Sequence, residues 1–186
     1  MSFKSREESD YTSHYCEENV YKYLEKVEDI RGFYVVIISN KNRQIPLWGQ
    51  NINEDDPDLP VMWDYHVILI RKGTDGAPSL VFDFDSKLDF PVDFNTYYEQ
   101  TMKYAVQNVF TRYFRVFPAL TYLSCFSSDR RHMRDARGHW IMPPPAWEPI
   151  VQKDLDNFHS AWIEMKKPIY DSEIYDEMEF CNFFKP

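Results

Sequence analysis

The strongest structural signal lies in residues 61–85, VMWDYHVILIRKGTDGAPSLVFDFD, where two strand-like segments flank a turn. Residues 61–70 are rich in β-branched and aromatic side chains, and residues 80–85 alternate apolar and polar side chains. Between them, Gly-Thr-Asp-Gly and a proline are typical of a turn. The simplest arrangement is therefore a hairpin of two antiparallel strands.

Two polar side chains of this hairpin face one another in the simplest register. If Ile70 pairs with Ser79 across the turn, His66 lies opposite Asp83, with their Cβ atoms about 5 Å apart. The carboxylate then holds one imidazole nitrogen while the other nitrogen faces outward. Such a pair is either the orienting pair of a catalytic triad or a structural pair in a sheet. A slip of two residues would place Asp85 or Val81 there instead.

Residues 17–30 predict an amphipathic helix, since one face is charged and the other carries Val20, Tyr23, Leu24 and Val27. Thr12 and Ser13 are candidate caps, so we expect the helix to begin near Cys16. Unpaired N–H groups at a helix start lower the pKa of a thiol, while the two glutamates that follow Cys16 oppose this effect. Cys16 is thus either a nucleophile or a buried core residue.

The rest of the chain predicts a single domain over residues 1–186, because no repeat or flexible linker divides it. We expect residues 1–10 to be flexible, and the 17% of aromatic residues supply enough apolar surface for a core. Further expected elements are strands at 33–38 and 45–48, a helix at 97–114, an ordered loop from 127 onward and one or two short helices within 156–186.

The composition excludes several classes of function. A net charge of −9 at pH 7 repels phosphate backbones and anionic lipids, so neither nucleic acid nor a membrane is an expected partner. We find no secretory signal and no membrane span, and three dispersed cysteines without a CxxC pair indicate neither disulfides nor zinc. The other histidines lack the spacing of metal ligands, so no metal is expected. A soluble protein of the cytoplasm, and also of the nucleus, fits this pattern.

Three short segments occur in the order YCEEN at residues 15–19, WDYHV at 63–67 and FDFD at 82–85. Together they resemble protein N-terminal glutamine amidohydrolases, and WDYHV is the most specific of the three. The resemblance covers about residues 11–145, with further agreement at 37–40, 45–48, 90–91, 114–116, 128–133 and 138–145. It departs at Phe82 and Phe84, where the family often has Tyr and Leu, and in the aromatic-rich tail.

The resemblance implies a papain-like or transglutaminase-like α+β core with a mostly antiparallel sheet and the nucleophile at a helix N-terminus. Its catalytic triad carries over onto Cys16, His66 and Asp83, the aspartate that the hairpin register also selects. The implied reaction converts an N-terminal glutamine of a protein to glutamate, with loss of ammonia and through a thioester. The resemblance further implies a monomeric enzyme without a cofactor that acts upstream of arginylation in the N-degron pathway.

Selecting a terminal glutamine requires an acceptor for its α-amino group, and Glu18 and Asp64 are the acidic candidates near the site, with Trp63 shaping the pocket. Two other hypotheses about the function remain. One is a cysteine peptidase or transglutaminase-type acyl transferase, since the same triad serves those reactions. The other is a protein-interaction module that uses the acidic surface and the proline-rich loop, with Cys16 inert.

Overall fold

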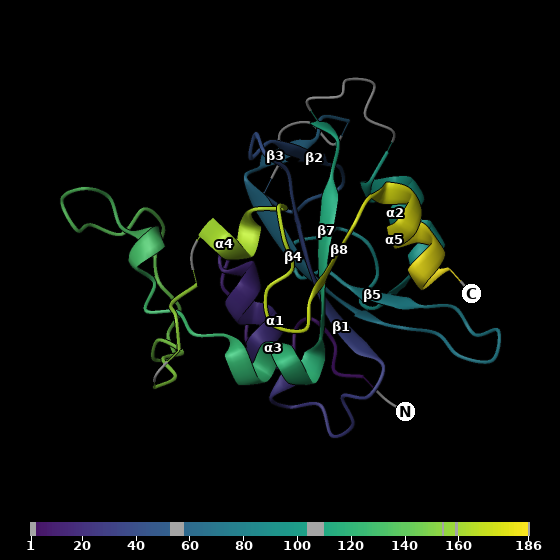
Figure 1. Ribbon diagram of the computed structural model, residues 1–186, viewed down its shortest axis with the longest axis horizontal. Coiled ribbons are helices and arrows are strands. Elements are labelled where there is room, and N and C mark those ends of the chain that lie inside the picture. The colour runs from purple at the N-terminus through teal and green to yellow at the C-terminus, as the bar shows by residue number, and fades with distance from the viewer. Residues whose placement is uncertain (1–2, 53–57, 104–109, 154, 159, 186) are drawn as a thin grey trace.

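The computed structural model describes residues 3–52, 58–103, 110–153, 155–158 and 160–185. Within these ranges the chain forms an α+β domain around an antiparallel sheet, as predicted (Figure 1). The strands are β1 (Phe33–Ser39), β2 (Ile45–Leu47), β3 (Val61–Trp63), β4 (Tyr65–Arg71), β5 (Leu80–Phe82), β6 (Val92–Asp93), β7 (Tyr113–Pro118) and β8 (Glu173–Tyr175). The helices are α1 (Cys16–Leu24), α2 (Phe94–Thr101), α3 (Ala119–Cys125), α4 (Ser160–Ile163) and α5 (Glu177–Phe184), with a 3-10 turn, η2, at Arg131–Met133.

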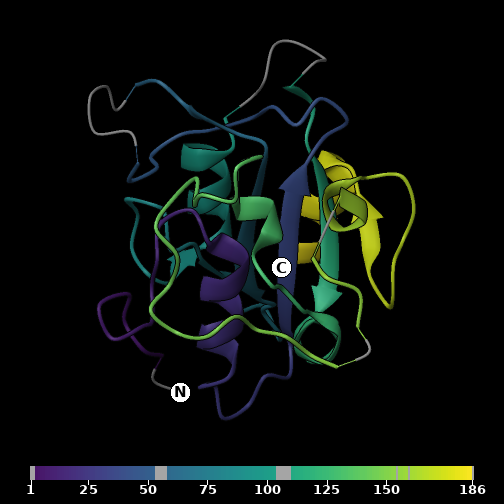
Figure 2. The same ribbon diagram turned by 90° about the vertical axis from the view of Figure 1, so that its left-hand side faces the viewer.

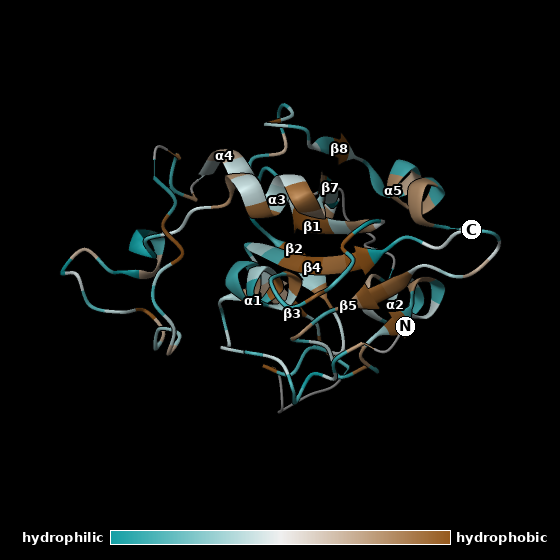
Figure 3. Cartoon of the chain, turned by 90° about the horizontal axis from the view of Figure 1, so that it is seen from below, coloured by the Kyte–Doolittle hydropathy of each residue, from teal (hydrophilic) through white to brown (hydrophobic). Residues whose placement is uncertain are grey.

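The main sheet has six strands in the order β6-β5-β4-β1-β7-β8, and β2 pairs with β3 in a separate ribbon. Helices cover both faces, with α1 and α3 on one side and α2 and α5 on the other (Figure 1 and Figure 3). Side chains of β1 therefore alternate between two apolar cores: Val35 and Ile37 belong to the α1 side, Val36 and Ile38 to the α2 side. This double burial explains why β1 is a continuous apolar run.

The hairpin of β4 and β5 exists, but its predicted register is wrong by two residues. Ile70 pairs with Val81 rather than with Ser79. Ser79 is engaged elsewhere, because its hydroxyl accepts from the Gly73 N–H at 3.0 Å and its carbonyl oxygen accepts from the Phe94 N–H at 2.9 Å. The second strand also ends at Phe82, so the residues after it leave the sheet.

The single strand predicted over residues 61–70 is interrupted at Asp64. The Asp64 carboxylate accepts the backbone N–H of Tyr65 at 2.9 Å, and its carbonyl oxygen accepts the Ser39 hydroxyl at 2.8 Å. These bonds turn the chain between β3, which pairs with β2, and β4, which lies in the main sheet. The interruption places Trp63 and Asp64 at the end of the sheet.

The first helix begins at Cys16, as predicted, but it ends at Leu24 rather than near residue 30. Its N-cap is Tyr15, which makes no side-chain capping bond, so the predicted caps were wrong. Thr12 instead bonds through its backbone to the Asn19 side-chain amide, with both distances at 2.9 Å. That pair of bonds fixes the chain just before the helix.

The predicted helix over residues 97–114 is only partly correct. Asp93 caps α2, whose last residue is Thr101; residues 104–109 lie outside the described ranges, and Tyr113 already belongs to β7. In the tail the expected short helices are present as α4 and α5, whereas β8 was missed. No helix of the described ranges combines the length and apolar character needed to cross a membrane.

The segment after α3 forms the long ordered loop that its irregular sequence predicted. It runs across the α1 side of the molecule (Figure 2). Its backbone is tied internally, for example by the Ser128 N–H to the Ile150 carbonyl at 2.6 Å. Its side chains reach α1, which brings part of the loop beside the helix start. The expectation that residues 1–10 are flexible stays a prediction.

Candidate active site

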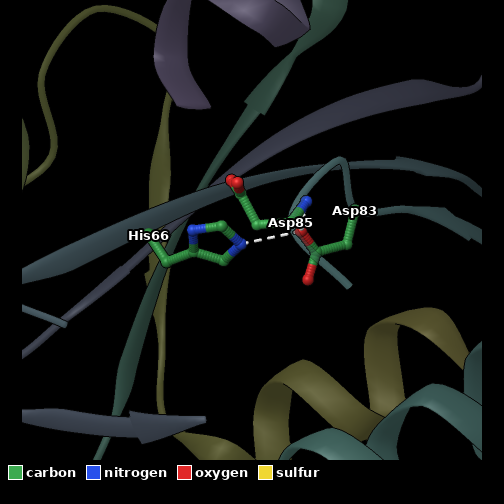
Figure 4. Close-up of side chains that lie close together, drawn as sticks. All are labelled: His66, Asp83 and Asp85. Carbon is green, nitrogen blue, oxygen red and sulfur yellow. Dashed lines mark hydrogen bonds and ion pairs between the residues drawn. The ribbon is translucent and has the colours of Figure 1, made fainter. Parts of the chain in front are cut away.

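A buried polar contact joins His66 and Asp83. Nε2 of His66 lies 2.8 Å from Oδ1 of Asp83, and both side chains are buried (Figure 4). Because Asp83 follows the end of β5, it meets His66 by turning back toward β4 rather than by facing it across a ladder. The predicted pairing is therefore present, although the register from which it was predicted is not.

Asp83 is held firmly in this position. Its second oxygen accepts hydrogen bonds from the Tyr97 hydroxyl at 2.8 Å and from the Gln50 amide at 3.2 Å. Its first oxygen also accepts the backbone N–H of Asp85 at 3.0 Å. Both carboxylate oxygens are thus hydrogen-bonded, and these bonds hold the carboxylate in its orientation toward the imidazole.

The pKa values of His66 and Asp83 shift in opposite directions. Burial by itself lowers the pKa of His66, but the charge and hydrogen bond of Asp83 outweigh it, so the pKa lies above its ordinary value. Burial likewise raises the pKa of Asp83, but the charge of His66, with the Tyr97 and Gln50 bonds, leaves it below its ordinary value. The pair therefore stabilises a protonated imidazole beside an ionised carboxylate.

The other ring nitrogen of His66 is the one available for chemistry. Nδ1 is buried and has no hydrogen-bond partner among the described residues. The indole of Trp63 stacks on the imidazole, with ring centroids 4.7 Å apart and an interplanar angle of 27°. Stacking on one side and Asp83 on the other fix the ring, so the direction of Nδ1 is fixed as well.

Cys16 is the first residue of α1 and is 3% exposed. The helix packs against β4, and the backbone of Val67, the residue after His66, is close enough to the thiol to act on its pKa. The sulfur also lies 3.6 Å from a carboxylate oxygen of Glu17. The fold thus brings the thiol to the strand that carries the histidine.

The expected lowering of the thiol pKa is not observed. Burial raises the pKa of Cys16 well above its ordinary value, and the charges of Glu17 and Asp85 add to this. The Val67 N–H acts in the opposite direction but does not compensate. Cys16 is therefore a thiol at rest, and its attack on a carbonyl requires a base that removes the proton.

The sequence placed Glu17 next to the thiol but did not predict its burial or its contacts. Glu17 is fully buried; one oxygen accepts the Tyr65 hydroxyl and the other lies near Nε2 of His132, both at 3.2 Å. His132 was not predicted at the site, and its ring reaches Glu17 from η2. The position of Glu17 in the first turn, where acidic residues are common, gave no signal for these contacts.

A cavity of about 460 Å³ opens beside these groups. Cys16, Trp63 and Asp64 line it, together with His132 of the long loop. Glu18 does not line it: its oxygens bind Arg130 at 2.8 Å twice and the Trp147 indole N–H at 2.7 Å. Of the three residues proposed to contact a substrate, the structure thus places Trp63 and Asp64 at the cavity and Glu18 in an ion pair behind it.

Among the described residues, the group spaced to hold a metal ion consists of His66, Asp83 and Asp85. Most of its ligand atoms are already engaged, because Nε2 of His66 and both oxygens of Asp83 bind protein groups. Nδ1 of His66 and one oxygen of Asp85 remain, which is fewer than the three or four protein ligands that zinc usually takes. The arrangement favours acid–base chemistry at a thiol.

The sequence of this chain is similar to those of known enzymes. The family description of N-terminal glutamine amidases matches residues 11–184. The protein N-terminal glutamine amidohydrolase of Caenorhabditis briggsae is 46% identical over 185 residues, covering 97% of each chain. That of Caenorhabditis elegans is 41% identical, covering 97% of this chain and 98% of the relative. That of Drosophila melanogaster is 42% identical, covering 94% and 88%.

The match extends through the parts of the chain that build the site. It includes α1 with Cys16, the strands around His66 and Asp83, and the long loop that carries His132. It also includes the tail with β8 and α5, where the resemblance visible in the sequence was weak. On the extent of this match and the identity to its relatives, the chain belongs to the N-terminal glutamine amidase family.

Proposed function

We propose that this protein hydrolyses the side-chain amide of glutamine at the amino terminus of proteins, producing glutamate and ammonia. Family membership supports the reaction class, and the relatives carry the name of that activity. The single observation that carries the chemistry is the buried His66–Asp83 pair, whose free ring nitrogen lies in the same interior as the Cys16 thiol. A papain-like or transglutaminase-like core with a Cys-His-Asp triad accounts for this arrangement.

In the first half of the reaction, Nδ1 of His66 accepts the thiol proton as the sulfur attacks the side-chain carbonyl carbon of the substrate. The base is required because the pKa of Cys16 is raised by its burial. His66 then passes that proton to the leaving nitrogen, the carbon–nitrogen bond breaks, and ammonia departs. A glutamyl thioester remains on Cys16.

In the second half, His66 takes a proton from water as the water oxygen attacks the thioester carbon. The carbon–sulfur bond breaks, and His66 returns the proton to the sulfur, which releases glutamate. Asp83 keeps the imidazole in the tautomer with a proton on Nε2 and stabilises the charged ring that forms twice in the cycle. The backbone N–H of Cys16, at the start of α1, is the proposed donor to the oxyanion.

Restriction to the amino terminus needs an acceptor for a charged α-amino group. Asp64 is exposed at the cavity and is the stronger of the two original candidates, since the carboxylate of Glu18 is occupied by Arg130. Trp63 forms the wall between this carboxylate and His66. We assign the α-amino group to Asp64 and the apolar stem of the glutamine to the wall at Trp63.

We place the reaction in the cytoplasm, where the glutamate it creates is arginylated by a separate transferase and the protein is marked for degradation. The enzyme works as a monomer without a cofactor. These assignments rest on the resemblance to the family and not on the geometry of the site.

Intact-mass analysis of a short peptide that begins with glutamine tests the proposal, beside a control peptide with glutamine only at an internal position. The mass separates glutamate from the cyclised product, which also forms with loss of ammonia. We expect conversion of the terminal glutamine alone, and none with Cys16→Ala. Cleaved or crosslinked peptides would favour a peptidase or transglutaminase, and unchanged peptides with folded protein would favour an interaction module.

A further inference from the structure

A third carboxylate lies in the active site and has no role in the mechanism above. Asp85 is fully buried. One of its oxygens accepts the Tyr11 hydroxyl at 2.7 Å, while the other is buried without a hydrogen-bond partner in the described part of the chain. A buried acceptor that makes no bond costs free energy, so such an atom points to a partner that arrives with a ligand.

The carboxylate of Asp85 lies beside the His66–Asp83 pair. The ligand atoms of Asp85, His66 and Asp83 all lie within 4.8 Å of one another. Figure 4 shows the carboxylate of Asp85 on the helix side of the imidazole, near the ring edge between the two nitrogens, whereas Asp83 meets Nε2. The charge of Asp85 also acts on the thiol of Cys16. Asp85 is therefore near the imidazole and close enough to the thiol for its charge to act on the sulfur.

The neighbouring carboxylates differ from Asp85 in this respect. Both oxygens of Asp83 are used by His66, Tyr97 and Gln50. Glu17 bonds to groups on its own side of the thiol through both of its oxygens. Among the buried acids at this site, Asp85 is the one with a free acceptor in the described structure.

Resting on the proposed function, we infer that Asp85 accepts a hydrogen bond from the –NH₂ group of the amide being hydrolysed. The leaving nitrogen must lie near Nδ1 of His66 to receive its proton, and that places its N–H groups beside the free oxygen of Asp85. The bond orients the nitrogen toward His66 and favours an amide over groups without N–H donors. The product carboxylate has no such donor, so Asp85 holds the product less well than the substrate.

The test compares two peptides that differ only in the scissile group: an N-terminal glutamine and the γ-methyl ester of an N-terminal glutamate. The ester carries the same α-amino group and stem but no N–H donor. The quantity measured is kcat/KM, because it reports the steps up to the thioester for both peptides. Intact mass identifies the glutamate product, and rates without enzyme are subtracted.

We expect Asp85→Ala to reduce kcat/KM for the amide by about tenfold or more, and that for the ester by no more than about twofold. Tyr11→Phe, which frees the carboxylate to turn, should give a smaller loss in the same direction. Asp64→Asn is the matched control, because both peptides share the α-amino group and the ratio of the two rates should stay constant.

Equal losses for the two peptides in Asp85→Ala would mean that Asp85 is only structural, and an amide rate that does not fall would remove it from the reaction. If Asp85→Ala unfolds, the amide-to-ester ratio of kcat/KM in Tyr11→Phe becomes the test, and an unchanged ratio would mean that Asp85 is only structural. Wild-type turnover of the terminal glutamine separates this proposal from the proposed function, since that turnover does not depend on the role of Asp85.

Discussion

Replacing Asp83 with asparagine removes the negative charge beside His66 and leaves most of the local hydrogen bonds possible. The asparagine oxygen can still accept from Nε2 of His66 and from the Asp85 N–H, as Oδ1 does now at 2.8 and 3.0 Å. Its –NH₂ group would then face Tyr97 and Gln50, and the Gln50 carbonyl oxygen has no present partner among the described residues. Rotation of the Gln50 amide supplies an acceptor, so the variant should fold.

The expected cost falls on catalysis. The imidazolium that forms in each half-reaction loses a buried ionic partner, which is worth about 2–4 kcal/mol. That corresponds to a loss of about 30- to 1000-fold in kcat/KM. Burial by itself lowers the pKa of His66, and Asp83 is what holds it above its ordinary value. Without the charge the pKa falls, so the acidic limb of the kcat/KM profile should move to lower pH.

The measurement is glutamate formation from a peptide with N-terminal glutamine between pH 5 and 9, together with thermal melting of each variant. Tyr97→Phe is the control, because it removes one bond to Asp83 and keeps the charge. At about 1 kcal/mol for that bond the control should lose roughly fivefold. A folded asparagine variant within threefold of wild type, or an acidic limb that moves to higher pH, would refute the reasoning.

Three further outcomes are expected. Cys16→Ser should abolish turnover with a melting temperature close to that of wild type, measured by mass spectrometry and calorimetry. Alkylation of Cys16 by iodoacetamide should be slow at neutral pH because burial, and then Glu17, raise the thiol pKa; Glu17→Gln should speed it, and an unchanged rate would count against this cause. Arg130→Ala breaks a buried ion pair and should cost about 3–5 kcal/mol of unfolding free energy. Arg131→Ala breaks an exposed pair and should change it by less than about 0.5 kcal/mol, as denaturant titration would show.

The composition of residues 61–85 was enough to predict the hairpin, because strand-forming residues and a turn are local signals. The pairing register of β4 and β5 could not be predicted from these signals. Ser79 bonds to Gly73 and Phe94, and these contacts shift the pairing by two residues. The predicted contact between Asp83 and His66 is present, but not because the two residues pair across the strands. Asp83 follows the end of β5 and reaches His66 from there.

The family resemblance and the helix pattern placed Cys16 correctly at the start of α1. The state of its thiol was not predictable, because it depends mainly on burial and also on the charge of Asp85, which lies in the segment after β5. The ion pair of Glu18 was not predictable either, because its partner Arg130 lies 112 residues away in the chain. A charged residue near a nucleophile looks like a substrate contact until its distant partner is known.

The two edges of the main sheet are unusually short. On one edge β6 contains only Val92–Asp93, and Asp93 turns at once to cap α2. On the other edge β8 contains three residues, of which Glu173 is exposed. Short edges that end in charged side chains present few free backbone groups to a strand from another molecule. The sheet therefore gives little opportunity for edge-to-edge aggregation, even though its central strands are almost entirely apolar.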